Sequence, residues 1–67
     1  MDIGNNLKKL RKLKNLTQDD VAKVLNVSRQ AYSRYENNQR ELSLSALCQL
    51  ADLFEETTDT ILGREPF

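Results

Sequence analysis

Two short amphipathic segments between residues 17 and 37 restrict the possible folds of this chain more than any other feature. Each segment follows a hydroxyl residue, Thr17 or Ser28, of the type that caps helix N-termini. The apolar residues within each segment recur at helical spacing, and only two residues separate the first segment from the second cap. The sequence therefore predicts two short helices, at 18–25 and 29–36, joined by a tight turn.

Local chemistry supports this unit at several points. Asp20 lies three residues after the first cap, where its carboxylate can return a hydrogen bond in a variant of the capping box. Asn26 tolerates the left-handed backbone conformation that ends a helix. Val27 follows it and is predicted to fill the core between the two helices. The small Ala22 is predicted to lie where the helices cross closely.

The rest of the chain is also predicted to be helical, because glycine and proline total only three of 67 residues and loops must therefore be short. Residues 3–14 form the first predicted helix, capped by Asp2. Residues 44–54 form the fourth, capped by Ser43. The predicted core stripes of these helices contain Ile3, Leu7, Leu10 and Leu13 in the first, and Leu44, Leu47, Cys48, Ala51 and Phe54 in the fourth, where Leu50 and Leu53 broaden the stripe.

The C-terminal segment is predicted to add one short helix. Thr57 or Thr58 caps it, residues 59–62 form it, and Gly63 ends it. Together the segments predict an all-α fold class, a compact five-helix bundle with a central helix-turn-helix. Sixty-seven residues suffice for one domain, 1–67, near the lower size for unaided folding.

The types of side chain present exclude several kinds of chemistry. The chain has no histidine, so histidine-based metal sites and nucleophiles with a histidine base are excluded. The carboxylates form no pair suited to catalysis, and there is no glycine-rich phosphate loop. We therefore predict no enzyme, no metal and no cofactor. Cys48, the single cysteine, is interpreted as a small buried hydrophobe rather than a redox sensor.

The sequence contains no signal for export or membrane insertion. No apolar run approaches the length of a membrane span, and the N-terminal residues lack the apolar stretch of a signal peptide. A single cysteine permits no internal disulfide, which fits a reducing compartment. We expect a cytoplasmic location and no membrane partner.

The net charge of zero conceals a strong separation of charge along the chain. Residues 1–40 contain nine Lys or Arg and four Asp or Glu, whereas residues 41–67 contain one Arg and six Asp or Glu. A local basic surface is sufficient to attract a polyanion. The acidic part is expected to face away from it.

The polar side of helix 29–36 carries the side-chain types that read base edges in a DNA major groove. Arginine binds O6 and N7 of guanine as a fork, and glutamine binds N6 and N7 of adenine. The alternative is an ordinary solvated helix face, but the capped helix-turn-helix context favours contact with bases or phosphates. The predicted base-contacting residues are Arg29, Gln30, Ser33 and Arg34.

Two tyrosines flank this face. Tyr35 is predicted to lie in the core. Tyr32 is also predicted to lie in the core, with its hydroxyl near the surface, and DNA contact is the alternative for this residue.

A series of positions is specific in its joint order and spacing: Leu16-Thr17-Gln18, Val21-Ala22, Leu25, Val27-Ser28-Arg29-Gln30, Tyr32-Ser33, Tyr35-Glu36-Asn37, Leu44, Leu47, Leu50-Ala51, Phe54 and Ile61-Leu62-Gly63. This series resembles the Cro and phage-repressor type of helix-turn-helix, the lambda-repressor-like or xenobiotic-response-element family. The resemblance covers nearly the whole chain as one five-helix domain.

The resemblance implies roles for individual residues. Arg11 and Glu36 would form a partly buried salt bridge that joins the first helix to the recognition helix. Gln18 would contact a phosphate and brace the base-reading side chains. The N-termini of both motif helices and the loop after the second would also anchor on phosphates. The expected phosphate-contacting residues are Gln18, Ser28, Asn37, Asn38 and Arg40.

Two positions depart from the family pattern. Asn38 stands where a glycine is common, and Leu42 stands where a proline is common. Asparagine can adopt the backbone conformation of that glycine, so the fold is expected to be unaffected. The path of the loop against the phosphates is left open.

The expected function is that of a sequence-specific transcriptional regulator, prokaryotic or phage, that binds double-stranded DNA at the nucleoid and acts as a repressor. Operator readers commonly bind palindromic half-sites as dimers, so we expect a homodimer. Leu62 and Phe67 are its expected interface, the alternative being that they close the monomer core together with Ile61. The rival function is a protein-interaction module, such as an antitoxin or a transcription bridging factor, that uses the acidic C-terminal half.

Overall fold

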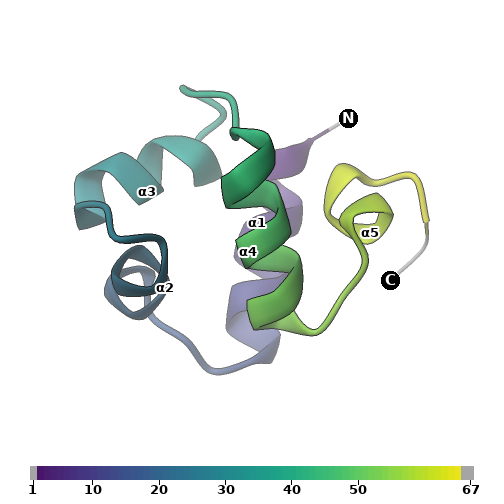
Figure 1. Cartoon of the computed structure of the whole chain (residues 1–67), viewed down its shortest axis with the longest axis horizontal. Coiled ribbons are helices and arrows are strands. Elements are labelled where there is room, and N and C mark those ends of the chain that lie inside the picture. Colours follow the sequence, from purple (N-terminus) through teal and green to yellow (C-terminus); the bar gives the residue numbers. More distant parts are fainter. Residues whose placement is uncertain (1, 66–67) are drawn as a thin grey trace.

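The computed structural model describes residues 2–65 and contains five helices, in the predicted order. Figure 1 shows α1 and α4 crossing the middle of the molecule, with α2 and α3 at one end of the long axis and α5 at the other. The described residues contain no strand, which agrees with the predicted all-α class. The helices are α1 (Ile3–Leu13), α2 (Gln18–Leu25), α3 (Arg29–Glu36), α4 (Leu44–Phe54) and α5 (Thr58–Leu62).

Side-chain caps fix where the helices begin. In each helix an oxygen of the capping side chain accepts a hydrogen bond from the backbone N–H three residues on, as expected for an N-cap. Asp20 and Thr17 complete the predicted capping box, because the Asp20 carboxylate also accepts from the Thr17 N–H at 2.9 Å. The caps are Asp2, Thr17, Ser28 and Ser43, as predicted, and Thr57, one of the two residues that the sequence offered for α5.

Residues in the left-handed conformation fix where the chain turns. Asn26 (φ 58°) ends α2 and Gly63 (φ 79°) ends α5, as predicted. Asn38 (φ 58°) follows α3, so asparagine does replace the glycine conformation there. Asn15 and Glu55 adopt the same conformation, and neither was predicted from the sequence to do so.

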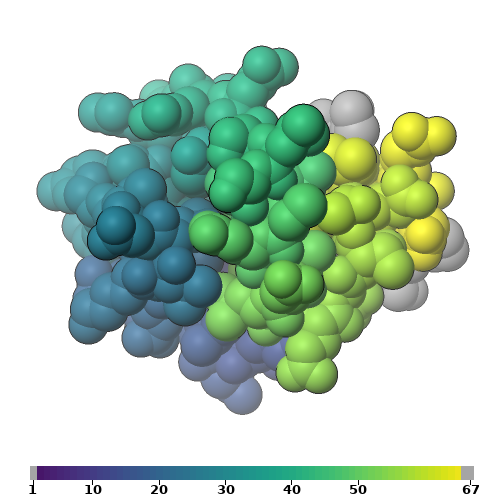
Figure 2. All heavy atoms as spheres, viewed as in Figure 1, coloured from purple at the N-terminus to yellow at the C-terminus, as the bar shows by residue number. Residues whose placement is uncertain are grey.

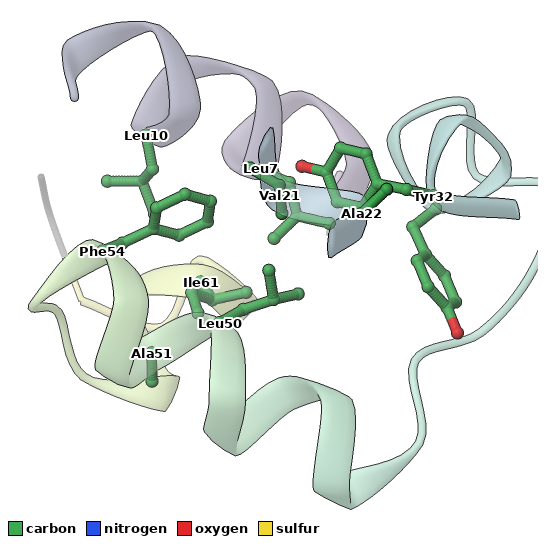
Figure 3. Packing of buried hydrophobic residues seen from close by; sticks show 10 residues of the cluster. Leu7, Leu10, Val21, Ala22, Tyr32, Leu50, Ala51, Phe54 and Ile61 are labelled. Carbon is green, nitrogen blue, oxygen red and sulfur yellow. The ribbon is translucent and has the colours of Figure 1, made fainter. Parts of the chain in front are cut away.

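The core lies where α1, α2 and α4 meet, and it is closed by α3 on one side and α5 on the other (Figure 3). Ala22 of α2 is buried in the core. Ile61 is fully buried and closes the α5 side. Seven large side chains are less than 2% exposed or at that limit: Tyr32, Phe54, Leu7, Leu10, Leu50, Ile61 and Val21.

The predicted core stripe of α4 was wrong at two positions. Leu44 is 82% exposed, and Cys48, one turn later on the same side, is exposed as well. The helix is rotated so that Leu50, Ala51 and Phe54 enter the core, which turns the side of Leu44 and Cys48 outward. The interpretation of Cys48 as a buried hydrophobe is therefore also wrong.

Two further core predictions are corrected. Leu13 is 72% exposed because α1 ends there and the chain reverses, so Leu16 packs against the core instead. Val27 does not fill the core, since it lies at the outside of the turn between Asn26 and the cap of α3 and is 37% exposed. Leu25 packs against the core from this end of α2.

Candidate nucleic-acid interface

The turn between α2 and α3 is held by backbone hydrogen bonds. Val27 N donates to Ala22 O at 3.0 Å, and Asn26 N donates to Lys23 O at 3.1 Å. Ser28 then begins α3, its Oγ accepting from Ala31 N at 3.1 Å. These bonds satisfy groups that a helix end otherwise leaves unpaired, so the two helices form one rigid unit.

One side of α3 is buried and the other is open to solvent. Tyr32, Tyr35 and Glu36 face inward, which confirms the prediction of a core position for both tyrosines. On the other side Arg29, Gln30 and Arg34 are exposed and Ser33 is half-buried. No ion pair within residues 2–65 involves Arg29 or Arg34, so both guanidinium groups are available to a ligand.

The residues expected to contact phosphates differ in whether their side chains are exposed and in whether they already bond within the protein. Asn37 and Arg40 are exposed; Nδ2 of Asn37 donates to Ser33 Oγ at 3.3 Å, and the Arg40 guanidinium lies 5.9 Å from the centre of the Tyr35 ring. Ser28 uses its hydroxyl as a cap. Gln18 and Asn38 are held by other parts of the fold, as described below.

Arg11 and Glu36, the pair implied by the family resemblance, are in direct contact. Nε of Arg11 donates to Glu36 Oε2 at 2.6 Å and Nη2 donates to Oε1 at 3.2 Å, a fork-like arrangement. The two side chains are only 11% and 2% exposed. Nη1 of Arg11 also donates to Leu16 O at 2.9 Å, which ties the loop before α2 to the pair.

Gln18 connects a third helix, α2, to the Arg11–Glu36 pair, and we call Arg11, Gln18 and Glu36 the junction. Its Nε2 donates to Glu36 Oε1 at 3.0 Å, so the Glu36 carboxylate accepts from α1 and from α2 while belonging to α3. The role that the family resemblance implies for Gln18, contact with a phosphate and bracing of the base-reading side chains, stays a prediction. Within the protein, its bond to Glu36 holds the start of α2 against the end of α3.

The surroundings of the junction shift the pKa values of the Glu36 carboxyl and of the neighbouring Tyr32 hydroxyl. Burial would raise the pKa of Glu36, but the bonds from Arg11, the nearby Tyr32 hydroxyl and the bond from Gln18 outweigh it and hold the pKa below its usual value. The stabilisation from Glu36 is therefore present above the unfolded-state pKa and is lost as the pH falls through the folded-state pKa. Burial is the main cause that raises the pKa of the Tyr32 hydroxyl, and the nearby Glu36 carboxylate raises it further.

The hydroxyl of Tyr32 is buried, so the prediction that it lies near the surface is wrong, and DNA contact by this residue is excluded in this conformation. It meets no hydrogen-bond partner of good geometry within residues 2–65. The Tyr32 and Tyr35 rings contact each other edge to face, with centroids 6.3 Å apart.

Charge is distributed unevenly over the ends of the molecule. Figure 2 shows α2 and α3 (blue to teal) at one end and α5 (yellow) at the other. The exposed acidic residues Glu55, Glu56 and Glu65 flank α5 in the chain, and α5 lies at the opposite end of the molecule from α3. This arrangement separates the acidic segment from the arginine-bearing helix.

Two negative findings concern other kinds of site. Within residues 2–65, no group of three or more His, Cys, Asp or Glu side chains is placed to hold a metal ion. No helix among these residues is long and apolar enough to cross a membrane.

Comparison with known proteins decides the family. A family model described as helix-turn-helix matches residues 7–61, which include the whole of α2 and α3. The chain belongs to this helix-turn-helix family. The match confirms the Cro and phage-repressor type of fold predicted from the sequence.

Relatives and a solved structure agree with this assignment. The chain is 46% identical over 59 residues to the HTH-type transcriptional regulator AnsR of Bacillus subtilis, and 35% identical over 63 residues to the antitoxin PezA of Streptococcus pneumoniae. These alignments cover 88% and 94% of this chain but only 51% of AnsR and 40% of PezA, so the chain spans about half or less of each relative. The crystal structure of the restriction-modification controller protein C.AhdI from Aeromonas hydrophila superposes with a TM-score of 0.81 at 27% identity, covering 90% of this chain and 91% of C.AhdI.

Proposed function

We propose that this chain is a DNA-reading domain, formed by residues 1–67, of a prokaryotic or phage transcriptional repressor. The observation that carries the proposal is the exposed side of α3, where two unpaired arginines and a glutamine project from a rigid helix-turn-helix. In this role α3 enters the major groove and Arg29, Gln30, Ser33 and Arg34 contact bases. The domain works by binding, without catalysis or a cofactor, in the cytoplasm at the nucleoid.

The structure favours one helix N-terminus over the other as a phosphate anchor. The first turn of α3 contains no acidic residue, so its free N–H groups and Arg29 offer positive potential. The first turn of α2 contains Asp19 and Asp20, which repel a phosphate even though Asp20 is engaged by the cap. We therefore place the principal phosphate anchor at Ser28, with the exposed Asn37 and Arg40 adding contacts after α3.

Selection of bound sequences from a random pool of DNA duplexes, at physiological salt, tests this function. An enriched inverted repeat with half-sites about 34 Å apart would support both a sequence-specific reader and a pair of copies on DNA. The absence of any enriched sequence, with only weak and salt-sensitive binding, would contradict it.

Removing either exposed arginine is expected to weaken binding to the selected sequence. Arg29→Ala and Arg34→Ala should each lower the affinity by about 1–3 kcal/mol if the side chain reads a base edge, and should relax the preference at one base pair. Because both residues are exposed and form no ion pair with any residue from 2 to 65, the melting temperatures of the two variants should stay close to that of the original protein. Unchanged affinity in both variants would contradict base reading by α3.

We also propose that two copies of the chain pair through an apolar groove of about 490 Å³. Leu62, one of the two predicted interface residues, lines this groove; Phe67, the other, lies outside the described residues. Leu44, which is 82% exposed, also lines the groove. A two-fold pairing can therefore bury Leu44 and Leu62 of each copy against the other copy.

Leu44→Gln is expected to weaken self-association at least about 100-fold, because the two-fold symmetry removes a buried leucine from both sides of the interface and each contributes about 1.5–3 kcal/mol. Sedimentation equilibrium over a range of protein concentrations measures the effect. Leu13→Gln is the matched control, since Leu13 is exposed to a similar degree but lies outside the groove. Equal association of both variants would show that the groove is not the interface.

The similarity to PezA favours one alternative function, an antitoxin-like module that binds a protein. In that case the acidic segment around α5 would contact the partner. Co-purification with a specific protein, at salt concentrations that abolish DNA binding, would support this alternative.

A further inference from the structure

The side chain of Asn38 reaches from the end of α3 to the first turn of α1. Its Oδ1 accepts a hydrogen bond from Gly4 N at 2.9 Å, and its Nδ2 donates to Asp2 Oδ1 at 2.9 Å. The partners lie 34 and 36 residues away along the chain. We call this three-residue contact of Asp2, Gly4 and Asn38 the clasp.

Each member of the clasp is adapted to it. An added Cβ on Gly4 would lie 2.2 Å from Glu36 O, so only glycine lets the first turn of α1 approach the end of α3 so closely. Asp2 Oδ1 accepts from Asn5 N at 3.0 Å as well as from Asn38, so one carboxylate oxygen both caps α1 and holds the clasp. Both bonds lower the pKa of the Asp2 carboxyl, and the bond from Asn38 has the larger effect.

The clasp gives Asn38 a role within the protein. Its Oδ1 is bonded to Gly4 N and one N–H of Nδ2 is bonded to Asp2, so the side chain is fixed in place with the second N–H of Nδ2 as its remaining donor. Two residues later, Arg40 is exposed and its guanidinium lies over the Tyr35 ring at 5.9 Å. The loop at residues 37–41 that carries Arg40 is therefore tied at Asn38 to α1, a helix outside the helix-turn-helix unit.

We propose that Asn38 is a positioning residue for DNA binding, which acts through the clasp by setting the path of loop 37–41 and so placing Arg40 against a phosphate. This inference rests on the proposed function. A glycine at this position would adopt the same backbone conformation and would lack both hydrogen bonds. Asn38→Gly thus removes the clasp while leaving the turn geometry accessible.

A double-mutant cycle tests whether Asn38 acts through Arg40. The duplex is the highest-affinity sequence from the selection experiment, and the variants are Asn38→Gly, Arg40→Ala and the two combined. Each single change is expected to weaken binding about tenfold and to lower the salt slope by about one, the effect of losing one phosphate contact. The affinity of the combined variant is expected to be at most about twofold lower than that of Arg40→Ala alone. The effects of two substitutions are not additive when the residues act as one unit.

Asn15→Gly is the matched control. Asn15 has the same left-handed conformation (φ 56°), is exposed, and makes no side-chain hydrogen bond to any residue from 2 to 65. It should share any general effect of replacing asparagine by glycine and leave DNA affinity unchanged. Amide hydrogen exchange supplies a readout without DNA: the Gly4 N–H should exchange faster in Asn38→Gly and at the original rate in Asn15→Gly.

Several outcomes would overturn the inference. If Asn38→Gly binds the duplex as tightly as the original protein, or if its effect multiplies with that of Arg40→Ala, Asn38 does not position Arg40, and the proposed function stands. An unchanged exchange rate of Gly4 N–H would show that the clasp does not order α1. If the original protein enriches no DNA sequence at all, the proposed function itself fails and this role fails with it.

Discussion

Replacing Arg11 by methionine is expected to destabilise the fold by about 3–5 kcal/mol, because it leaves the Glu36 carboxylate buried without its charged partner. The Glu36 side chain is 2% exposed, and the remaining bond from Gln18 is a single neutral donor. A 67-residue domain has a total stability of only about 3–10 kcal/mol, so the variant should be close to unfolding at room temperature. Urea unfolding followed by circular dichroism measures the loss.

Two comparisons isolate the cause. The combined variant Arg11→Met and Glu36→Leu should recover much of the loss, since removal of both charges leaves no uncompensated ion in the core. Lys23→Met disrupts the Lys23–Asp19 pair, whose side chains are 76% and 57% exposed, and should change stability little. Equal effects of Arg11→Met and Lys23→Met would contradict the structural importance of the buried pair.

Gly4→Ala is expected to cost about 3 kcal/mol, at the upper end for overpacking, although alanine is ordinarily the better helix former. The added Cβ would lie 2.2 Å from the backbone oxygen of Glu36 and 2.7 Å from its carbonyl carbon. Backbone atoms cannot move aside as a side chain can, so α1 and α3 must separate. Thermal unfolding should show a large fall in the melting temperature.

The control for this change lies next to it. Asn5→Ala adds no atoms near α3, and because Asn5 is exposed on α1 the change should leave stability within about 0.5 kcal/mol. Combining Gly4→Ala with Asn38→Gly removes the side-chain oxygen 2.9 Å from the added Cβ but not the clash with Glu36. The combined variant should therefore remain unstable; full recovery would show that the clash is with Asn38 alone.

Features of the fold that depend on near neighbours in the chain were predictable from the sequence. Caps such as Thr17 and Ser28 satisfy N–H groups three residues away, and Asn26 turns the chain by its own backbone preference. These local effects fixed the ends of α2 and α3 and hence the exposed side of α3. The pairing of Arg11 with Glu36 came from the family resemblance and not from spacing.

Features that depend on distant parts of the chain were missed or mistaken. The stripe of α4 contains apolar residues on more than one side, so periodicity alone did not show that Leu44 and Cys48 face solvent. The clasp joins residues more than 30 positions apart. One signal was present: a glycine in the first turn of a predicted helix, at Gly4, indicates a close approach of another backbone.

The division of α3 into a buried and an exposed side has a consequence for how such domains diversify. Tyr32, Tyr35 and Glu36 hold the helix in place, whereas the exposed side chains of Arg29 and Arg34 form no ion pair with any residue from 2 to 65. Substitutions on the outer side are therefore expected to change the stability of the fold little, whereas substitutions on the inner side are expected to lower it strongly. Under the proposed function, a lineage of such proteins can change the DNA sequence it binds by exchanging a few side chains on an unaltered scaffold.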